Sequence, residues 1–332
     1  EVVHQFLERV RSDHLRAGRR PGREIVDLRC RPVVDGDRVA VIVHVEDEVL
    51  AHNGEADEAD VGKAWHGDLL VIALDARLPA SGTVAVVERY VLGIDIGGSG
   101  IKGAPVDLAL GDLTEERHRI DTPTPSDPAA VLEVVAEIVD HFGYEGPVGC
   151  TLPSIVRHGV VESAANIDDA WIGVDGRAQL ERRLRMPTAL LNDADAAGIA
   201  EFTYGAAKGV AGLVCLLTLG TGIGSAMFVD GVLVPNTEFG HLEFKGGDAE
   251  DYASARTRKD EGLSWEVWGL RVGEFLNHIE RVFSPDLFIL GGGVSRKLDR
   301  FDEYLNCTTP IVPAQLRNNA GIVGAALAAA AL

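Results

Sequence analysis

The sequence predicts an α/β protein of two domains separated by a cleft, preceded by an N-terminal extension. Strand-like and helix-like segments alternate from Val91 to the end of the chain, which is typical of α/β folds. A glycine-rich turn after the apolar strand that ends at Asp95 is echoed after Thr218, as expected of two equivalent halves. The 332 residues suffice for two ordinary domains with sizeable cores.

Composition and charge narrow the class of protein. Hydrophobic residues make up 46% of the chain and charged residues 25%, as in globular proteins, and no apolar run is long enough to span a bilayer. The formal net charge of −20 argues against broad binding of nucleic acid or anionic membranes. Four scattered cysteines indicate neither a zinc ribbon nor a disulfide framework. With no apolar leader at the N-terminus, we expect a cytoplasmic protein.

Residues 1–90 form an extension whose role the sequence leaves open. The segment is arginine-rich between residues 6 and 31, a polar acidic loop is predicted at 52–60, and no catalytic constellation is present. No helix-turn-helix pattern supports a DNA-reading domain, so we favour a small accessory β domain or an upstream extension. The strand-like runs in it are Val39–Val45, Leu69–Leu74 and Thr83–Val87.

The stretch Val91–Asp107 carries the first chemical signal. An apolar strand ends at Asp95, a turn with three glycines follows, and Lys102 opens a second strand. Glycine lets backbone N–H groups approach a ligand closely, so this turn predicts a cradle for phosphate oxygens. An acid at the strand end could hold Mg²⁺ beside them. The alternative interpretation is an ordinary tight hairpin.

Patterning predicts the remaining elements. Asp127-Pro128 predicts an N-cap and first helical residue, because aspartate caps helices and proline suits the first position. Apolar spacing then predicts inward faces at Val131, Val134, Ile138 and Phe142 in that helix, and at Trp265, Trp268, Val272, Phe275 and Ile279 in a helix over 264–283. Strands are predicted at 148–152, 187–191, 213–219 and 286–290, and an alanine-rich helix at 321–332.

The glycine turn is echoed 123 residues later without a gap. Asp95–Ser99 aligns with Thr218–Gly222, and Val106-Asp107 then falls on Val229-Asp230. Two such hairpins facing one cleft would grip phosphate from both sides. No G-x-x-x-x-G-K-[ST] motif is present, which excludes a P-loop. A dinucleotide fingerprint fits poorly, because a strand rather than a helix follows the turn.

Several polar residues are candidates for the chemistry. Asn192-Asp193 stands where a strand meets a helix; Asp193 is either the base that accepts a hydroxyl proton or a helix cap, and Asp195 is its local competitor. Glu238 and His241 could bind neighbouring sugar hydroxyls, or be a loop acid and a structural histidine. For Glu250 the alternative is surface charge. Asn166 with Trp171 suits a sugar, although a core tryptophan is the common alternative.

These residues resemble the ROK family of sugar kinases, in the actin-like/hexokinase (ribonuclease H-like) superfamily, and within it the bacterial polyphosphate glucokinases. The resemblance spans about residues 91–332. The pieces that carry it, in family order, are GIDIGGSGIKGAPVD, LNDADAAGIAE, TLGTGIGSAM, EFGHLEF, SPDLFILGGGVS and TPIVPAQLRNNAGIVGAA.

The resemblance implies phosphoryl transfer to the 6-hydroxyl of glucose from polyphosphate or ATP, with Mg²⁺, in a homodimer. It implies a small domain at 91–191, with the helix at 320–332 packing back on it, and a large domain at 192–319. Asp193 is then the general base. Sugar ligands are Asn166, Asn192, Glu238, His241 and Glu250. Phosphate or nucleotide contacts come from Asp95 (also the Mg²⁺ residue), Gly97, Gly98, Ser99, Lys102, Gly220, Thr221, Gly222, Gly291 and Gly292.

Departures and alternatives accompany this resemblance. Many family members carry a zinc-binding cysteine motif after Glu-x-Gly-His, whereas KGGDAEDYAS here has no cysteine, so we expect no zinc. Alternatives are an ATP-dependent glucokinase or glucomannokinase, and a sugar-responsive transcriptional regulator, which an intact Asp193 argues against. A polyphosphate donor needs a positive track, for which the candidates are Lys208, Arg256, Arg258, Lys259, Arg296 and Lys297.

Overall fold

The computed structural model describes residues 27–35, 38–46, 69–75 and 89–332, and the chain divides into two compact units, Glu1–Arg89 and Tyr90–Leu332. No helix in these described ranges has the length and apolar character needed to cross a membrane.

The described part of the first unit is an antiparallel sheet in the order β1-β2-β3. Strands β2 (Arg38–Glu46) and β3 (Leu69–Asp75) confirm two of the three predicted runs. Strand β1 (Asp27–Asp35) overlaps the segment that we described only as arginine-rich, so its strand was missed. The predicted run at 83–87 and the loop at 52–60 lie outside the described residues.

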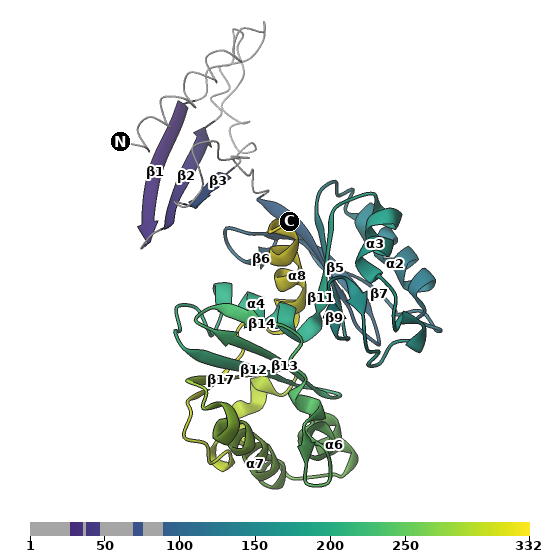
Figure 1. The fold of residues 1–332 in the computed structure, drawn as a ribbon, viewed down its shortest axis with the longest axis vertical. Coiled ribbons are helices and arrows are strands. Elements are labelled where there is room, and N and C mark those ends of the chain that lie inside the picture. The colour runs from purple at the N-terminus through teal and green to yellow at the C-terminus, as the bar shows by residue number, and fades with distance from the viewer. Residues whose placement is uncertain (1–26, 36–37, 47–68, 76–88) are drawn as a thin grey trace, which may run out of the picture. The chain divides into compact units, whose positions relative to one another are not determined.

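The first sheet of the second unit has the order β11-β8-β4-β5-β6, with β7 also paired to β5. Its centre is the antiparallel β4–β5 hairpin, beside which β8 and β11 run parallel. Helices α2 and α3 cover one face and α8 the other (Figure 1). The bounds are β4 (Tyr90–Ile96), β5 (Ile101–Asp107), β6 (Asp112–Leu113), β7 (His118–Ile120), β8 (Val148–Leu152), β11 (Thr188–Asn192), α2 (Pro128–His141), α3 (Gly176–Leu184) and α8 (Ala320–Ala330).

Helix α2 begins as predicted. The side chain of Asp127 accepts a hydrogen bond from Ala130 N, and proline stands in the first helical turn. Val131 and Ile138 are fully buried, whereas Val134 and Phe142 pack against the core with part of their surface exposed. Trp171 is buried and donates its Nε1 hydrogen to Ser126 O, so it is a core residue rather than a sugar contact.

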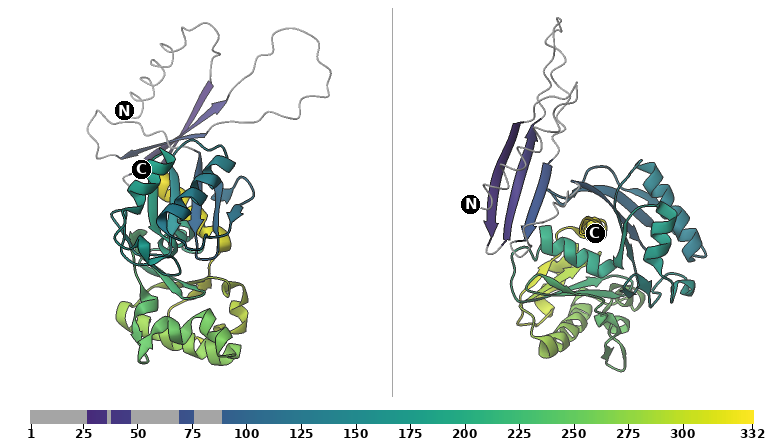
Figure 2. Two further views of the ribbon diagram at one scale, coloured as in Figure 1. Left: turned by 90° about the vertical axis from the view of Figure 1, so that its right-hand side faces the viewer. Right: turned by 45° about the horizontal axis from the view of Figure 1, so that its top comes forward.

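The second sheet has the order β14-β13-β12-β17-β18. Helix α4 packs on one face, and α7 lies on the other, as the views in Figures 1 and 2 agree. Trp268 and Phe275 of α7 are fully buried as predicted. Trp265 is only half-buried; it is the first residue of α7, and its ring stacks on Phe301. The bounds are β12 (Leu213–Leu219), β13 (Ile223–Val229), β14 (Val232–Val234), β17 (Leu287–Gly291), β18 (Ile311–Pro313), α4 (Asp193–Tyr204) and α7 (Trp265–Phe283).

The internal echo is present in the topology. Hairpin β12–β13 has β17 running parallel beside β12, as hairpin β4–β5 has β8 beside β4. The gapless alignment is correct for the first strand of each hairpin and one residue out of register for the second. The first turn has four residues, Gly97–Gly100, and the second has three, Gly220–Gly222, so Ile101 corresponds to Ile223.

The backbone of helix α8 packs directly against the backbones of neighbouring elements. A Cβ atom at Gly93 of β4 would lie 1.9 Å from Ile322 O, and one at Gly149 of β8 would lie 1.8 Å from Ala325 O. On the other side of α8, a Cβ at Gly324 would lie 1.8 Å from Ala196 O of α4. Glycine at these positions lets one helix pack against both the first sheet and α4, which joins the two halves of this unit.

We expect Gly149→Ala to destabilise the second unit by about 1–3 kcal/mol or more, because overpacking against backbone forces the helix to shift. Denaturant unfolding measures this change. Gly247→Ala is the matched control, since a Cβ there would meet nothing within 4 Å. Equal stability of the two variants would contradict the close packing of α8.

Candidate active site

Hydrogen bonds within the first glycine turn and from the segment that follows it fix the conformation of this turn. Gly97 N donates to Gly100 O at 3.1 Å and closes the hairpin. The guanidinium of Arg119 donates to Ser99 O at 2.8 Å, and Thr122 Oγ1 donates to Gly97 O. In the described part of the chain, Ser99 N has no hydrogen-bond partner. The carbonyls are therefore tied back while this N–H at the tip is available to an anion.

Asn166 lies directly against this turn. A Cβ at Gly98 would lie 2.6 Å from Asn166 O, so the close approach requires glycine. Asn166 itself adopts φ = 62°, a conformation that asparagine tolerates better than most residues. The structure thus brings one predicted sugar contact beside the first phosphate turn.

Asp95 is fixed by three different elements. Its Oδ1 accepts a hydrogen bond from Thr151 Oγ1 of β8 at 2.9 Å, and its Oδ2 pairs with Lys102 Nζ of β5 at 2.9 Å. A Cβ at Gly321 of α8 would lie 3.0 Å from the Asp95 carboxylate. The sequence prediction missed Thr151 and Gly321, which support Asp95 from segments distant in the chain.

The structure separates the roles of Asn192 and Asp193. Asn192 ends β11 and caps α4: its Oδ1 accepts from Ala194 N and Asp195 N, and its Nδ2 donates to Ser154 O. Its remaining N–H is the part still able to bind a sugar. Asp193 is the first residue of α4, and Asp193 Oδ1 accepts from Ala194 N at 2.8 Å. The carboxylate of Asp193 is therefore not the helix cap.

The environment of Asp193 makes it a stronger base than an ordinary aspartate. Burial raises its pKa to about 7, and the nearby negative charges of Asp95 and Glu238 act in the same direction. The hydrogen bond from Ala194 N opposes this rise. Perturbed carboxyls of this kind are typical of catalytic sites.

Asp195 is neither a cap nor a solvent-facing residue. It is 2% exposed, its Oδ2 accepts from Asn236 N at 2.8 Å, and burial raises its pKa to about 7. The Asn236 side chain makes two hydrogen bonds with the backbone of Val156 in β9 (Val156–Arg157). Asp195 and Asn236 therefore anchor the segment that leads to Glu238. Sequence reasoning missed Asn236, whose partners lie 41 and 80 residues away.

Glu250 supports the second glycine turn. It stands in the first turn of α5 (Ala249–Ala253), and its Oε2 accepts from Ile223 N at 3.0 Å. A Cβ at Gly222 would lie 2.3 Å from that oxygen. Gly220 N closes the turn on Gly222 O at 3.0 Å, and Thr221 N at the tip has no partner among the residues described. The second turn thus repeats the available N–H of the first.

Glu238 immediately precedes the 3₁₀ turn η2 (Phe239–His241), and His241 is its last residue. Burial raises the pKa of Glu238, the charge of Glu250 adds to that rise, and the charge of His241 opposes it. His241 is exposed, and its Nδ1 contacts Asp248 Oδ2 at 2.8 Å, which raises the pKa of His241. Asp248 lies in the segment where we noted the missing cysteines. The described residues contain no group of three or more His, Cys, Asp or Glu that could hold a metal ion.

The third glycine run lies against the second turn. A Cβ at Gly292, which has φ = 79°, would lie 2.3 Å from Leu219 O, and one at Gly291 would lie 3.2 Å from Thr218 Cγ2. A Cβ at Gly293 would meet nothing within 4 Å. This run therefore continues the open backbone surface of the turn at Gly220–Gly222.

The candidate cations for a phosphate track do not all share one groove. Arg256 N in α6 (Ala255–Asp260) donates to Gly220 O, which places this residue at the second turn. Arg258 lies 3.6 Å over the ring of Trp265, with Lys297 Nζ 5.8 Å from the same ring. Lys208 and Lys259 are exposed. Arg296 lines a cavity that is described below.

Together these elements can position and activate a hydroxyl beside a phosphate. Two turns present free N–H groups, and Ala194, next to Asp193, contacts the second hairpin at Gly224. A carboxylate with a pKa near neutrality can accept a proton while the N–H groups neutralise developing negative charge.

Known proteins resemble this chain in sequence and in fold. The model of the ROK family matches residues 91–251. The polyphosphate glucokinase of Mycobacterium tuberculosis is 50% identical over 248 residues, which are 74% of this chain and 94% of that protein. The crystal structure of the inorganic polyphosphate/ATP-glucomannokinase from Arthrobacter sp. strain KM is 51% identical, with a TM-score of 0.70 over 74% of this chain and 99% of that one. A ROK family glucokinase from Streptomyces griseus, in complex with glucose and AMPPNP, is 25% identical, with a TM-score of 0.63 over 72% and 99% of the respective chains.

We expect Gly222→Ala to fold normally and to raise the KM for glucose about tenfold, because the new methyl group displaces the Glu250 carboxylate and Glu250 is a predicted sugar ligand. Steady-state kinetics with varied glucose measures this change. Gly247→Ala is again the matched control. An unchanged KM for glucose would contradict the role assigned to Glu250.

Proposed function

The chain belongs to the ROK family, and from that premise we propose that it phosphorylates glucose at the 6-hydroxyl with inorganic polyphosphate as donor. The observation that carries this proposal is 50% identity with a polyphosphate glucokinase over 94% of that protein. The pair of glycine turns beside Asp193 supports the same chemistry, because phosphoryl transfer requires mainly positioning and neutralisation of charge.

In this proposal Asp193 is the general base. Its buried carboxylate accepts the proton of the 6-hydroxyl as that oxygen attacks the terminal phosphorus of the donor, and the bond to the shortened donor breaks. Glu238, His241 and Glu250 orient the sugar, with Asn166 and the free N–H of Asn192 at its edge. The N–H groups at Ser99 and Thr221 and the ammonium of Lys102 stabilise the phosphate oxygens.

Mg²⁺ is the proposed metal, and Asp95 is the residue that would hold it. A single carboxylate at a strand end fits Mg²⁺, which usually keeps several waters and takes its other ligands from substrate phosphates. When bound, Mg²⁺ supplies positive charge to the transferring phosphoryl group. Lys102 already pairs with Asp95 and would then be released toward the phosphates.

ATP is the second proposed donor. The structural relative from Arthrobacter is a polyphosphate/ATP-glucomannokinase, and the relative from Streptomyces griseus was solved with AMPPNP. The glycine turns hold a terminal phosphate whichever donor carries it. We also propose a cytoplasmic homodimer, which the family resemblance supports.

We expect Asp193→Ala to fold and to lose nearly all kinase activity, by about 10²–10⁴-fold, because general-base catalysis contributes that much. Since protonated Asp193 cannot accept a proton, kcat/KM for glucose in the wild type should fall as the pH falls through about 7. Asp195→Asn is the control that separates the two acids, because the pKa of Asp195 is also about 7. That variant should keep the same midpoint in the pH dependence of kcat/KM. Near-wild-type turnover in Asp193→Ala would overturn the assignment.

The burial of Asp193 also predicts a pH-dependent stability. Its pKa is about 7 in the folded protein against an ordinary value of 3.8, so the folded state binds the extra proton between these values. The contribution of Asp193 to the free energy of unfolding is therefore fully present below pH 4 and is lost as the pH rises through 7. We expect Asp193→Asn to become more stable relative to the wild type as the pH rises: the difference between their unfolding free energies should change by about 2–4 kcal/mol from pH 5 to pH 8. A gap that stays constant with pH would contradict the raised pKa.

Donor use is tested by measuring glucose 6-phosphate formation with polyphosphate and with ATP in parallel. We expect turnover with polyphosphate. ATP turnover without polyphosphate turnover would refute the polyphosphate donor and leave the kinase assignment intact.

A further inference from the structure

Two adjoining cavities form a groove outside the residues assigned so far. The first, of about 620 Å³, is lined by η3 (Ser295–Arg300), by β18 and by the segment that follows it. The second, of about 490 Å³, shares Arg296, Gln315 and Arg317 with the first and extends to Arg117 and Asn318. The shared residues place the two cavities side by side.

Both walls of this groove are close in sequence to residues that pack beside the two glycine turns. The wall at 295–299 directly follows the glycine run at Gly291–Gly293, which packs on Leu219 beside the second turn. The wall at 315–319 directly precedes Gly321, which packs on Asp95 below the first turn. The groove therefore begins a few residues along the chain from residues that pack beside both turns, and it extends to Tyr204 and Ala206 at the C-terminal end of α4.

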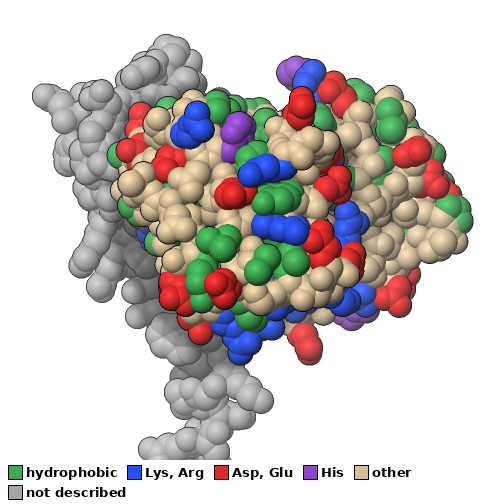
Figure 3. Space-filling model, turned by 90° about the horizontal axis from the view of Figure 1, so that it is seen from below, with side chains coloured by type: hydrophobic (Ala, Val, Ile, Leu, Met, Phe, Trp, Pro, Cys, Tyr) green, Lys and Arg blue, Asp and Glu red, His purple; other side chains and the backbone are tan. Residues whose placement is uncertain are grey.

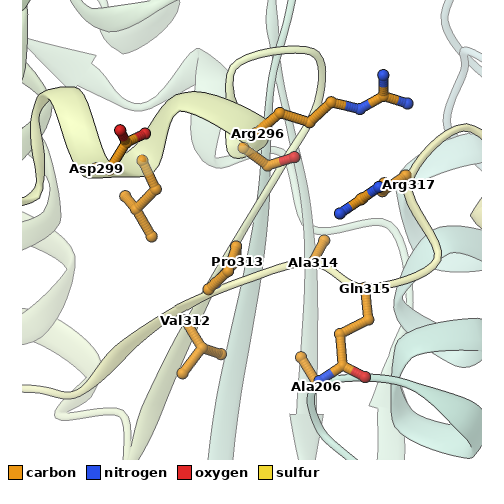
Figure 4. Close-up of a pocket in the computed structure, with 10 residues that line it drawn as sticks. Ala206, Arg296, Asp299, Val312, Pro313, Ala314, Gln315 and Arg317 are labelled. Atoms are coloured by element: carbon orange, nitrogen blue, oxygen red, sulfur yellow. The ribbon is translucent and has the colours of Figure 1, made fainter.

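The lining of the groove contains three arginines and two aspartates, so it is positive on balance. In Figure 4 the side chains of Arg296 and Arg317 come from two different segments, and both lie on the side of the first cavity opposite Asp299. The guanidinium group of neither arginine makes an ion pair or a hydrogen bond with any residue that the structure describes. Arg317 adopts φ = 54°, a strained conformation for a residue with a side chain, and its guanidinium lies over the groove. Arg117 stands at the second cavity and donates to Asn318 O at 3.2 Å.

The lining favours a polyanion over a nucleobase. It presents the three guanidinium groups together with the side-chain amides of Gln315, Asn318 and Asn319, against the two carboxylates of Asp112 and Asp299. Tyr204 is the one aromatic residue in the lining, and its ring is covered by Gly111, where a Cβ would lie 2.4 Å from the ring. Guanidinium groups bind phosphate oxygens strongly and bidentately. By contrast, the face over α6 and α7 intersperses basic with acidic side chains (Figure 3).

We propose that this groove binds the distal phosphates of a polyphosphate chain whose terminal phosphate lies between the two glycine turns. This inference rests on the proposed function, because it assigns a path to the donor. It adds Arg117, Arg317 and Gln315 to the binding residues, and it assigns the track to Arg296 rather than to Arg258 or Lys297, which pack on Trp265.

The test is the double variant Arg296→Gln/Arg317→Gln, with Arg281→Gln on the exposed side of α7 as matched control. We expect the KM for long-chain polyphosphate to rise about tenfold or more, because two charge-assisted phosphate contacts are lost. The KM for ATP and for glucose should stay within about twofold, and the salt dependence of the polyphosphate KM should weaken. The two single variants are measured as well, and denaturant unfolding checks that each is folded.

Each other outcome overturns the inference in a recognisable way. An unchanged KM for long-chain polyphosphate in the folded variants would show that the groove does not bind the donor. An equal rise for ATP would show that the groove belongs to a nucleotide site. If the wild type itself uses ATP but no polyphosphate, the proposed donor fails before any variant is compared.

Discussion

The backbone contact of α8 with its neighbours is the constraint on which this site depends. Glycines at 93 and 149 let the helix lie directly on the first sheet, and Gly324 lets it lie on α4. Gly321 of the same helix packs on Asp95, and α4 begins with Asp193. One helix therefore sets the position of both carboxylates. Because interiors are packed too densely to deform gradually, a shift of α8 would move the two groups together.

The carboxylates at the site oppose the stability of the fold. Burial and mutual repulsion raise the pKa of Asp193, Asp195 and Glu238, so each resists ionisation in the folded protein at neutral pH. The same environment makes Asp193 about 10³-fold more basic than an ordinary aspartate, by the three-unit difference in pKa. A sugar hydroxyl and a bound cation would relieve this repulsion. Natural proteins often sacrifice stability in this way at functional sites.

Local patterns predicted most of the second unit, and the residues that were missed depend on distant contacts. The cap at Asp127 and the strands around both glycine turns follow from neighbouring residues. The sequence did not reveal that one turn is a residue longer than the other, because a strand precedes each turn and both turns contain repeated glycines. Asp195 bonds to Asn236, 41 residues away, and Trp265 stacks on Phe301 from a distant segment. Spacing within one segment carries no information on such partners.

A protein with a net charge of −20 repels a polyanion at long range, so a polyphosphate site must overcome the average field locally. Exposed charges more than about 8 Å apart are largely screened at physiological salt, which limits this repulsion to close approach. Within that distance, the proposed groove presents Arg296 and Arg317, whose guanidinium groups make no ion pair with any described residue. In the proposed function, the terminal phosphate of ATP and that of polyphosphate offer the same oxygens to the N–H groups of the two glycine turns. Selectivity between the two donors must therefore arise beyond the transferred phosphate, where the groove begins.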